Sequence, residues 1–164
     1  MTEIIRNMAI HFVKDDGGRA AAGFKGDAGD CVARAVAIAS GRGYSTVYND
    51  LAAINAAMRK TKRRKKGSVG SVTARDGIYM QSKLFKDYMA RLGFRWVSTM
   101  AIGSGCKVHL RADELPAGRL VVRLSRHAAA VVDRVLHDNH DCSREGTRGV
   151  YGYWIFEGAR HENA

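Results

Sequence analysis

The sequence predicts an α+β domain in which N-terminal helices pack against a C-terminal antiparallel β-sheet. Two observations support this fold class. Between residues 31 and 92 the apolar residues recur at helical spacing, whereas from 94 to 156 they alternate as they do in strands. An order of helices followed by strands is typical of α+β proteins. The chain has 164 residues, of which 46% are hydrophobic, and this favours a single domain over residues 1–164.

Three helices are expected, and their ends carry residues typical of helix boundaries. Asp30 is a good N-cap for the first helix, and Gly41 ends it. Gly93 ends the third helix in the same way. A basic, flexible loop is expected at about 59–77, after the second helix. The expected helices cover 31–40, a segment that begins at Ser45, and roughly 78–92.

Alternating apolar residues and turn sequences indicate the strands. A loosely alternating segment at 3–13 predicts the first strand, and residues 19–24 predict a short return strand. Segments 127–133 and 135–138 are expected to form a hairpin that turns at 133–134. The other expected strands are 94–100, 119–124 and 150–156.

Composition and cysteine usage indicate the compartment. No apolar run approaches the ~20 residues needed to span a bilayer, so no membrane partner is expected. The N-terminus does not resemble a secretory signal peptide. The cysteines at 31, 106 and 142 include no CxxC pair, which favours a reducing compartment and therefore the cytoplasm. Cys106 and Cys142 are interpreted as incidental thiols.

Cys31, the first residue of the first expected helix, is a candidate nucleophile. The positive end of the helix dipole and the unpaired N–H groups favour a thiolate, and the same groups can bind an oxyanion. The alternative is that Cys31 is an apolar core residue, as cysteines commonly are. A histidine within hydrogen-bond reach of the sulfur would make it an activated nucleophile.

His127, at the start of the expected hairpin, is the candidate base, although an ordinary hydrogen-bonded histidine would fit the same position. With a two-residue turn, Ala129 pairs with Asp138. His127 in turn pairs with His140, so the four positions share one face of the sheet. Asp138 is then diagonal to His127, where its carboxylate would orient the imidazole. Asn139 would face the opposite side.

Three segments carry a resemblance to a known superfamily: GDCVARAVAIASGRGYSTVYNDL at 29–51, HAAAVVDRVLHD at 127–138 and VYGYW at 150–154. A cysteine that opens a helix, further helices, a histidine at a strand start and an aspartate on the next strand resemble the papain-like cysteine peptidase superfamily. More narrowly, the segments look like small bacterial and phage-borne members of that superfamily. The likeness covers about residues 26–156.

The resemblance implies a papain-like fold and a role for each candidate. By it, Cys31 is the nucleophile, His127 the base and Asp138 the orienting residue of a cysteine hydrolase. Such a peptidase or amidase forms a thioester, needs no cofactor and acts on a protein or peptide. Many members carry a glutamine about six residues before the cysteine, where it helps to hold the oxyanion. This chain has Lys25 there, so its ammonium is an oxyanion candidate or a sign of altered activity.

The segment HDNHDC, at 137–142, has the HxxH spacing of some metal sites. A zinc site is not favoured, because the other cysteines offer no matched pair of ligands. His137 and His140 would also face opposite sides of a strand. No metal is therefore expected.

The net charge of +11 arises largely in one segment, 59–66, which contains seven basic residues and no acidic one. Three interpretations stay open: a solvated loop, a contact to nucleic acid, or docking to an acidic protein. The last two support an alternative to the hydrolase, namely a non-catalytic binding module of the same fold. The seven basic residues are Arg59, Lys60, Lys62, Arg63, Arg64, Lys65 and Lys66.

Overall fold

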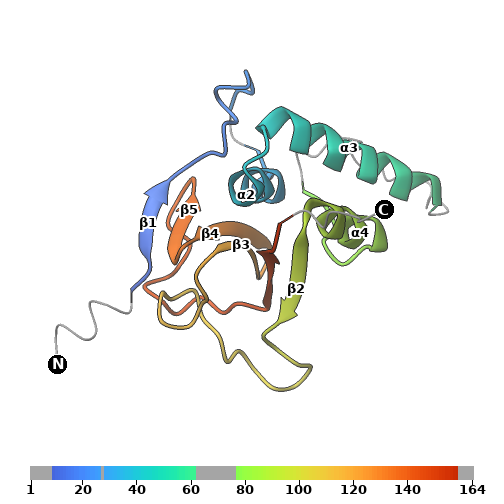
Figure 1. The fold of residues 1–164 in the computed structure, drawn as a ribbon. Coiled ribbons are helices and arrows are strands. Elements are labelled where there is room, and N and C mark those ends of the chain that lie inside the picture. The colour runs from blue at the N-terminus through green and yellow to red at the C-terminus, as the bar shows by residue number, and fades with distance from the viewer. Residues whose placement is uncertain (1–8, 27, 62–76, 159–164) are drawn as a thin grey trace, which may run out of the picture.

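The protein is a layer of helices on one face of an open, mixed β-sheet (Figure 1). The computed structural model describes residues 9–26, 28–61 and 77–158. The strand order is β1-β5-β4-β3-β6-β2. This architecture agrees with the expected α+β class. The described helices are α2 (Cys31–Ser40), α3 (Tyr44–Thr61) and α4 (Lys83–Leu92), and the strands are β1 (His11–Lys14), β2 (Phe94–Ser98), β3 (Arg119–Leu124), β4 (His127–Val132), β5 (Val135–Asp138) and β6 (Gly152–Phe156).

Local signals account for the helix ends. Gly41 ends α2 at the expected position with a φ of 73°, and Gly93 ends α4 with a φ of 97°. The start of α4 lies later than the expected residue 78, because the side chain of Ser82 accepts a hydrogen bond from the N–H of Phe85 at 3.2 Å. No described helix is both long and apolar enough to cross a membrane.

The hairpin of β4 and β5 has the expected register. Ala130 lies opposite His137, and the ladder runs from there to the turn. Asp133 and Arg134 have φ values of 48° and 64°. Two successive residues with positive φ are what a two-residue type I′ turn requires, and this turn matches the twist of the strands. The hairpin therefore holds His127 and Asp138 in the predicted relation.

The sheet departs from the expected antiparallel arrangement at one edge. β1 pairs with β5 in parallel, with His11 opposite Val135 and Lys14 opposite Asp138. The other strand pairs are antiparallel. A parallel pair requires a long crossover connection, and here the helices and the central strands of the sheet all lie between β1 and β5 in the chain.

The expected return strand at 19–24 is wrong, because this segment forms turns. The carboxylate of Asp16 accepts a hydrogen bond from the N–H of Gly18 at 2.9 Å, and such local bonds compete with strand pairing. Gly17 has a φ of 69°, and a Cβ there would lie 3.0 Å from the carbonyl oxygen of Arg34. The glycine therefore lets this turn lie directly against α2.

Apolar clusters fill both faces of the sheet. Alternation along β4 turns Ala128 and Ala130 towards the helices, and Ala129 and Val131 towards the opposite face. The small side chains of β4 let α2 pack closely over the strand (Figure 1). This packing fixes α2 against the strand that begins with His127. The buried apolar residues of α2 are Val32, Ala33, Ala35, Val36, Ala37 and Ala39.

Gly152, the first residue of β6, has no room for a side chain. A Cβ there would lie 2.4 Å from the Trp96 ring and 2.8 Å from the carbonyl oxygen of Val97. We predict that Gly152→Ala lowers the free energy of unfolding by about 1–3 kcal/mol, as measured by urea denaturation. In the control Gly43→Ala, the new Cβ would lie 3.9 Å from Thr46 Oγ1, so a smaller loss is expected. Equal losses in the two variants would contradict the steric argument.

Candidate active site

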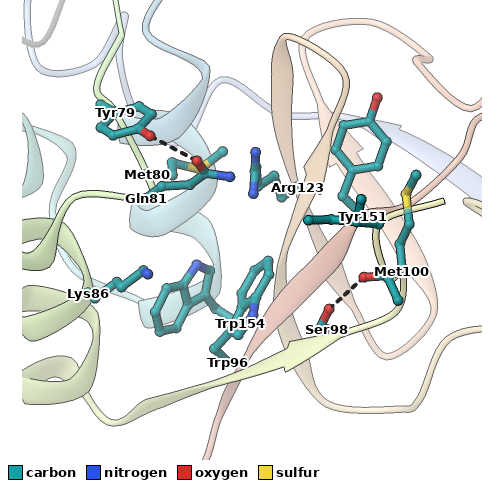
Figure 2. Close-up of a pocket in the computed structure, with 12 residues that line it drawn as sticks. Tyr79, Met80, Gln81, Lys86, Trp96, Ser98, Met100, Arg123, Tyr151 and Trp154 are labelled. Carbon is teal, nitrogen blue, oxygen red and sulfur yellow. Dashed lines mark hydrogen bonds between the residues drawn. The ribbon is translucent and has the colours of Figure 1, made fainter. Parts of the chain in front are cut away.

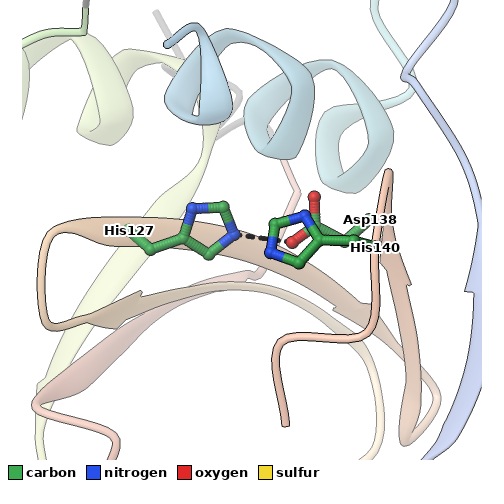
Figure 3. A group of neighbouring side chains, drawn as sticks. All are labelled: His127, Asp138 and His140. Carbon is green, nitrogen blue, oxygen red and sulfur yellow. Dashed lines mark hydrogen bonds and ion pairs between the residues drawn. The ribbon is translucent and has the colours of Figure 1, made fainter.

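The structure brings together the three residues that the sequence singled out. Cys31 is the first residue of α2, His127 the first of β4 and Asp138 the last of β5. The Nε2 atom of His127 lies 2.6 Å from Oδ2 of Asp138 (Figure 3). The other carboxylate oxygen of Asp138 accepts a hydrogen bond from the N–H of Asn139 at 2.7 Å. The buried carboxylate thus has both oxygens engaged, and it fixes the orientation of the imidazole.

The Cys31 thiol lies against His127 and Ala128, and its environment favours the thiolate. Burial alone would raise the pKa of Cys31. The hydrogen bond to His127, the charge of that ring and the backbone N–H of Ala128 act in the opposite direction, and Arg34 adds a favourable positive charge. The net result is a pKa of Cys31 below its usual value.

The His127 imidazole holds its proton strongly. Burial alone would lower the pKa of His127, but Asp138, followed by Cys142 and Cys31, raises it to about 11. Because Asp138 engages Nε2, the ring presents Nδ1 to the sulfur, and Nδ1 points towards α2 in Figure 3. With the pKa of His127 raised and that of Cys31 lowered, the pair is shifted towards a thiolate and an imidazolium.

Asp30 is fully buried at the N-cap position of α2, where it contacts three polar side chains. Arg19 Nη1 donates to Oδ2 of Asp30 at 2.8 Å, and the Tyr44 hydroxyl donates to the same oxygen. Arg34 Nη1 pairs with Oδ1 of Asp30. Asp30 occupies the expected N-cap position, but its side chain makes no cap hydrogen bond. The carboxylate instead compensates two buried guanidinium groups.

Arg34 connects this ion network to the candidate triad. It lies one turn after Cys31, and its Nη2 atom is 3.8 Å from Oδ1 of Asp138. Its guanidinium therefore lies between two buried carboxylates, those of Asp30 and Asp138. The sequence alone does not single out Arg34. The signal for this buried arginine is its position within the apolar run CVARAVAIAS, three residues after the candidate nucleophile.

Cys142 is a second thiol beside the imidazole, although the sequence suggested that it was incidental. Its side chain belongs to the apolar cluster on the sheet face opposite the helices. It interacts with His127 and Asp138, and burial raises the pKa of Cys142. At neutral pH it therefore stays a protonated thiol. The imidazole thus contacts two thiols whose pKa values are shifted in opposite directions, that of Cys31 downwards and that of Cys142 upwards.

His127, Asp138 and His140 form a group that could hold a metal ion, with ligand atoms all within 4.8 Å of one another (Figure 3). The HxxH pair does not meet, because His137 Nδ1 lies 3.1 Å from Asp15 Oδ2. Two imidazoles and a carboxylate would suit a zinc ion. A ligating histidine must be neutral, however, and the raised pKa of His127 opposes metal binding at neutral pH.

The remaining candidates lie apart from this group or beyond the described residues. Lys25 is exposed, and its carbonyl oxygen accepts a hydrogen bond from Arg19 Nη2 at 3.2 Å. Its oxyanion role stays a prediction. Arg59 and Lys60 belong to the last turn of α3. The rest of the basic segment, 62–66, lies outside the described residues, so its proposed contact with nucleic acid or an acidic protein also stays a prediction.

Comparisons with known proteins give no relative for the chain. It matches no family model, no curated protein and no solved structure. The functional argument therefore rests on the geometry of the site.

The ion pair of Arg34 and Asp30 is expected to be essential to folding. Arg34→Met would leave a buried carboxylate with less compensation, and we predict a loss of about 3–5 kcal/mol in the free energy of unfolding. Lys83→Met is the matched control, because Lys83 and Asp87 form an exposed ion pair with the same four-residue spacing. It should cost less than about 0.5 kcal/mol. Denaturant unfolding measures both, and a similar small loss in each would argue against a structural role for Arg34.

Proposed function

We propose that the protein is a papain-like cysteine hydrolase that acts on an amide or related acyl bond. The observation that carries this proposal is the position of His127, hydrogen-bonded to Asp138 on one side and in contact with the Cys31 thiol on the other. A nucleophile, a base and a group that orients the base are the three components that thiol-based acyl transfer requires.

The first half of the reaction forms a thioester. The Cys31 thiolate attacks the carbonyl carbon, and the C=O electron pair moves onto oxygen. Backbone N–H groups at the start of α2, including that of Cys31, are available to stabilise this oxyanion. The His127 imidazolium then donates its proton to the leaving amine as the C–N bond breaks. The products of this half are a free amine, a neutral imidazole and an acyl group on the Cys31 sulfur.

The second half restores the enzyme. Neutral His127 takes a proton from water, and the resulting hydroxide attacks the thioester carbon. Collapse of the tetrahedral intermediate breaks the C–S bond, so that the carboxylic acid leaves and Cys31 returns to the thiolate. Asp138 keeps Nε2 protonated throughout, so the exchange of protons takes place at Nδ1. Arg34 is a positioning residue, because it holds the Asp138 carboxylate in place.

The reactivity of Cys31 towards a thiol-directed electrophile tests the activation of the nucleophile. We predict that iodoacetamide alkylates Cys31 faster than the exposed Cys106 at pH 7, as followed by mass spectrometry of peptides. The rate of Cys31 labelling increases as the thiol loses its proton. This increase should occur below pH 9, because the pKa of the thiol is lowered from 9.0. In His127→Ala only burial and weaker interactions act on the thiol. The increase in rate should therefore move to higher pH, and labelling at pH 7 should slow by about tenfold or more.

A His140→Ala variant is the control for this experiment, because His140 lies beside the imidazole but does not orient it. It should retain the fast labelling of Cys31. Equal and slow labelling of Cys31 in the wild type and in His127→Ala would show that the thiol is not activated, and this would contradict the proposed hydrolase.

The Asp138 carboxylate is expected to set the pKa of His127. In the wild type this imidazole should remain protonated up to a pKa of about 11. Asp138→Asn removes the largest interaction that raises this pKa, so the ring should lose its proton at a lower pH. Proton NMR of the imidazole Cε1–H resonance measures the titration. Asp15→Asn, which alters the neighbouring pair with His137, is the control and should leave His127 unchanged. An unshifted titration in Asp138→Asn would contradict the assigned role.

A further inference from the structure

A pocket of about 550 Å³ opens on the helix side of the sheet (Figure 2). It lies between the start of α4 and the strands β2, β6 and β3. Two indole rings, those of Trp96 and Trp154, form an aromatic wall, with their centroids 5.2 Å apart. The two rings are inclined to one another by 53°, so the wall offers an angled apolar surface against which an apolar group can pack.

Arg123 projects into this pocket between Gln81 and Tyr151 (Figure 2). Its guanidinium lies 5.8 Å from the centroid of the Tyr151 ring. With the amide oxygen of Gln81 turned towards it, that oxygen lies 2.6 Å from both Nη atoms of Arg123. The Arg123 side chain is therefore held in place by a ring and a neutral acceptor.

The pocket carries uncompensated positive charge. Lys86, from α4, also lines it and is exposed. Within the part of the chain that the structure describes, neither Arg123 nor Lys86 forms an ion pair with a carboxylate. Two cations in the same pocket as an aromatic wall fit a ligand that combines an apolar group with an anion. The net charge of +11 would also attract an acidic ligand from solution.

The pairing of β3 with β4 places this pocket next to the nucleophile. Arg123 lies directly opposite Ala128 in the ladder. The backbone N–H of Ala128 in turn interacts with the Cys31 thiol. Directly opposed residues in an antiparallel pair have Cα atoms about 5 Å apart. A ligand bound at Arg123 can therefore extend to the thiol within a few peptide units.

We propose that this pocket binds an acidic peptide segment, in which a glutamate or aspartate pairs with Arg123 and an adjacent apolar side chain stacks on Trp96 and Trp154. The inference rests on the proposed function, because it is the amide of the same segment that Cys31 would attack. A peptide is favoured over a nucleotide because Arg123 is paired with Ala128, the residue whose N–H interacts with the Cys31 thiol, a group suited to acyl transfer. The carboxylate of the peptide supplies the anionic partner that Arg123 does not have among the described residues.

The test uses two pools of acetylated, amidated pentapeptides, one with a Glu beside a Phe and the other with a Gln in place of that Glu. Binding is measured to Cys31→Ser protein, which cannot turn the peptides over, through the change in tryptophan fluorescence. We expect the acidic pool to bind at least about tenfold more tightly than the neutral pool. Arg123→Met should remove this difference, and Lys86→Met should reduce it.

Arg95→Met is the matched control, because Arg95 is an exposed arginine of β2 that pairs with Glu157 and does not line the pocket. It should leave the preference for the acidic pool intact. Equal affinities for the two pools, or a preference that survives in both Arg123→Met and Lys86→Met, would overturn the inference. Binding of adenosine monophosphate is measured in the same way. If it binds, depends on Arg123, and neither peptide pool binds, the inference is overturned in favour of a nucleotide site.

Iodoacetamide labelling of Cys31 separates this inference from the proposed function. The wild type, which retains Cys31, reports the activation of the thiol, and the Cys31→Ser background reports the preference for acidic peptides. If Cys31 is not activated in any variant but the acidic pool still binds through Arg123, the hydrolase fails and the peptide site stands. If labelling of Cys31 is fast but the preference for acidic peptides is absent, the peptide site fails and the hydrolase stands.

Discussion

A carboxylate that is fully buried, as that of Asp30 is, requires positive charge at short range, because removing an ion from water costs several kcal/mol. Arg19 and Arg34 provide that charge from the loop before α2 and from α2 itself. Arg34 then extends the network to Asp138 at the end of β5. One set of ion pairs thus fixes the start of α2 relative to both the preceding loop and the sheet. The relation of Cys31 to His127 depends on that start.

The same network gives the site its electrostatic character. Arg19, Arg34 and the His127 imidazolium carry three positive charges and Asp30 and Asp138 two negative ones, so the surplus positive charge favours the anionic form of Cys31. Cys142 shares the imidazole with Cys31 but has a raised pKa, because burial dominates there and the Asp138 carboxylate disfavours a second anion. Cys31 instead has the Ala128 N–H and the Arg34 charge. The difference between the two thiols therefore comes from their neighbours and not from access to the base.

The features that could be predicted from the sequence are those that depend on residues close together in the chain. The β4–β5 register depended on a turn of two residues, and it correctly placed His127 beside Asp138. The bounds of α2 likewise followed from adjacent residues. The parallel pairing of β1 with β5 joins distant segments, so no local pattern could reveal it. Asp30 has the residue type of an N-cap, but it pairs with Arg19 and Arg34, contacts that are set by how the turn before α2 folds back onto the helix.

The hairpin of β3 and β4 joins the proposed peptide pocket to the candidate active site. Arg123 and Ala128 are opposed in the ladder, and His127 lies opposite Leu124 at the end of that ladder. Backbone hydrogen bonds therefore set the spacing between the backbone of Arg123 and that of His127. α2 packs on the same strand through small residues, which fixes the Cys31 sulfur in that frame as well. A segment held at Arg123 would consequently meet the thiol at a fixed number of residues along its chain, so selectivity for the bond attacked would follow from the register of two strands.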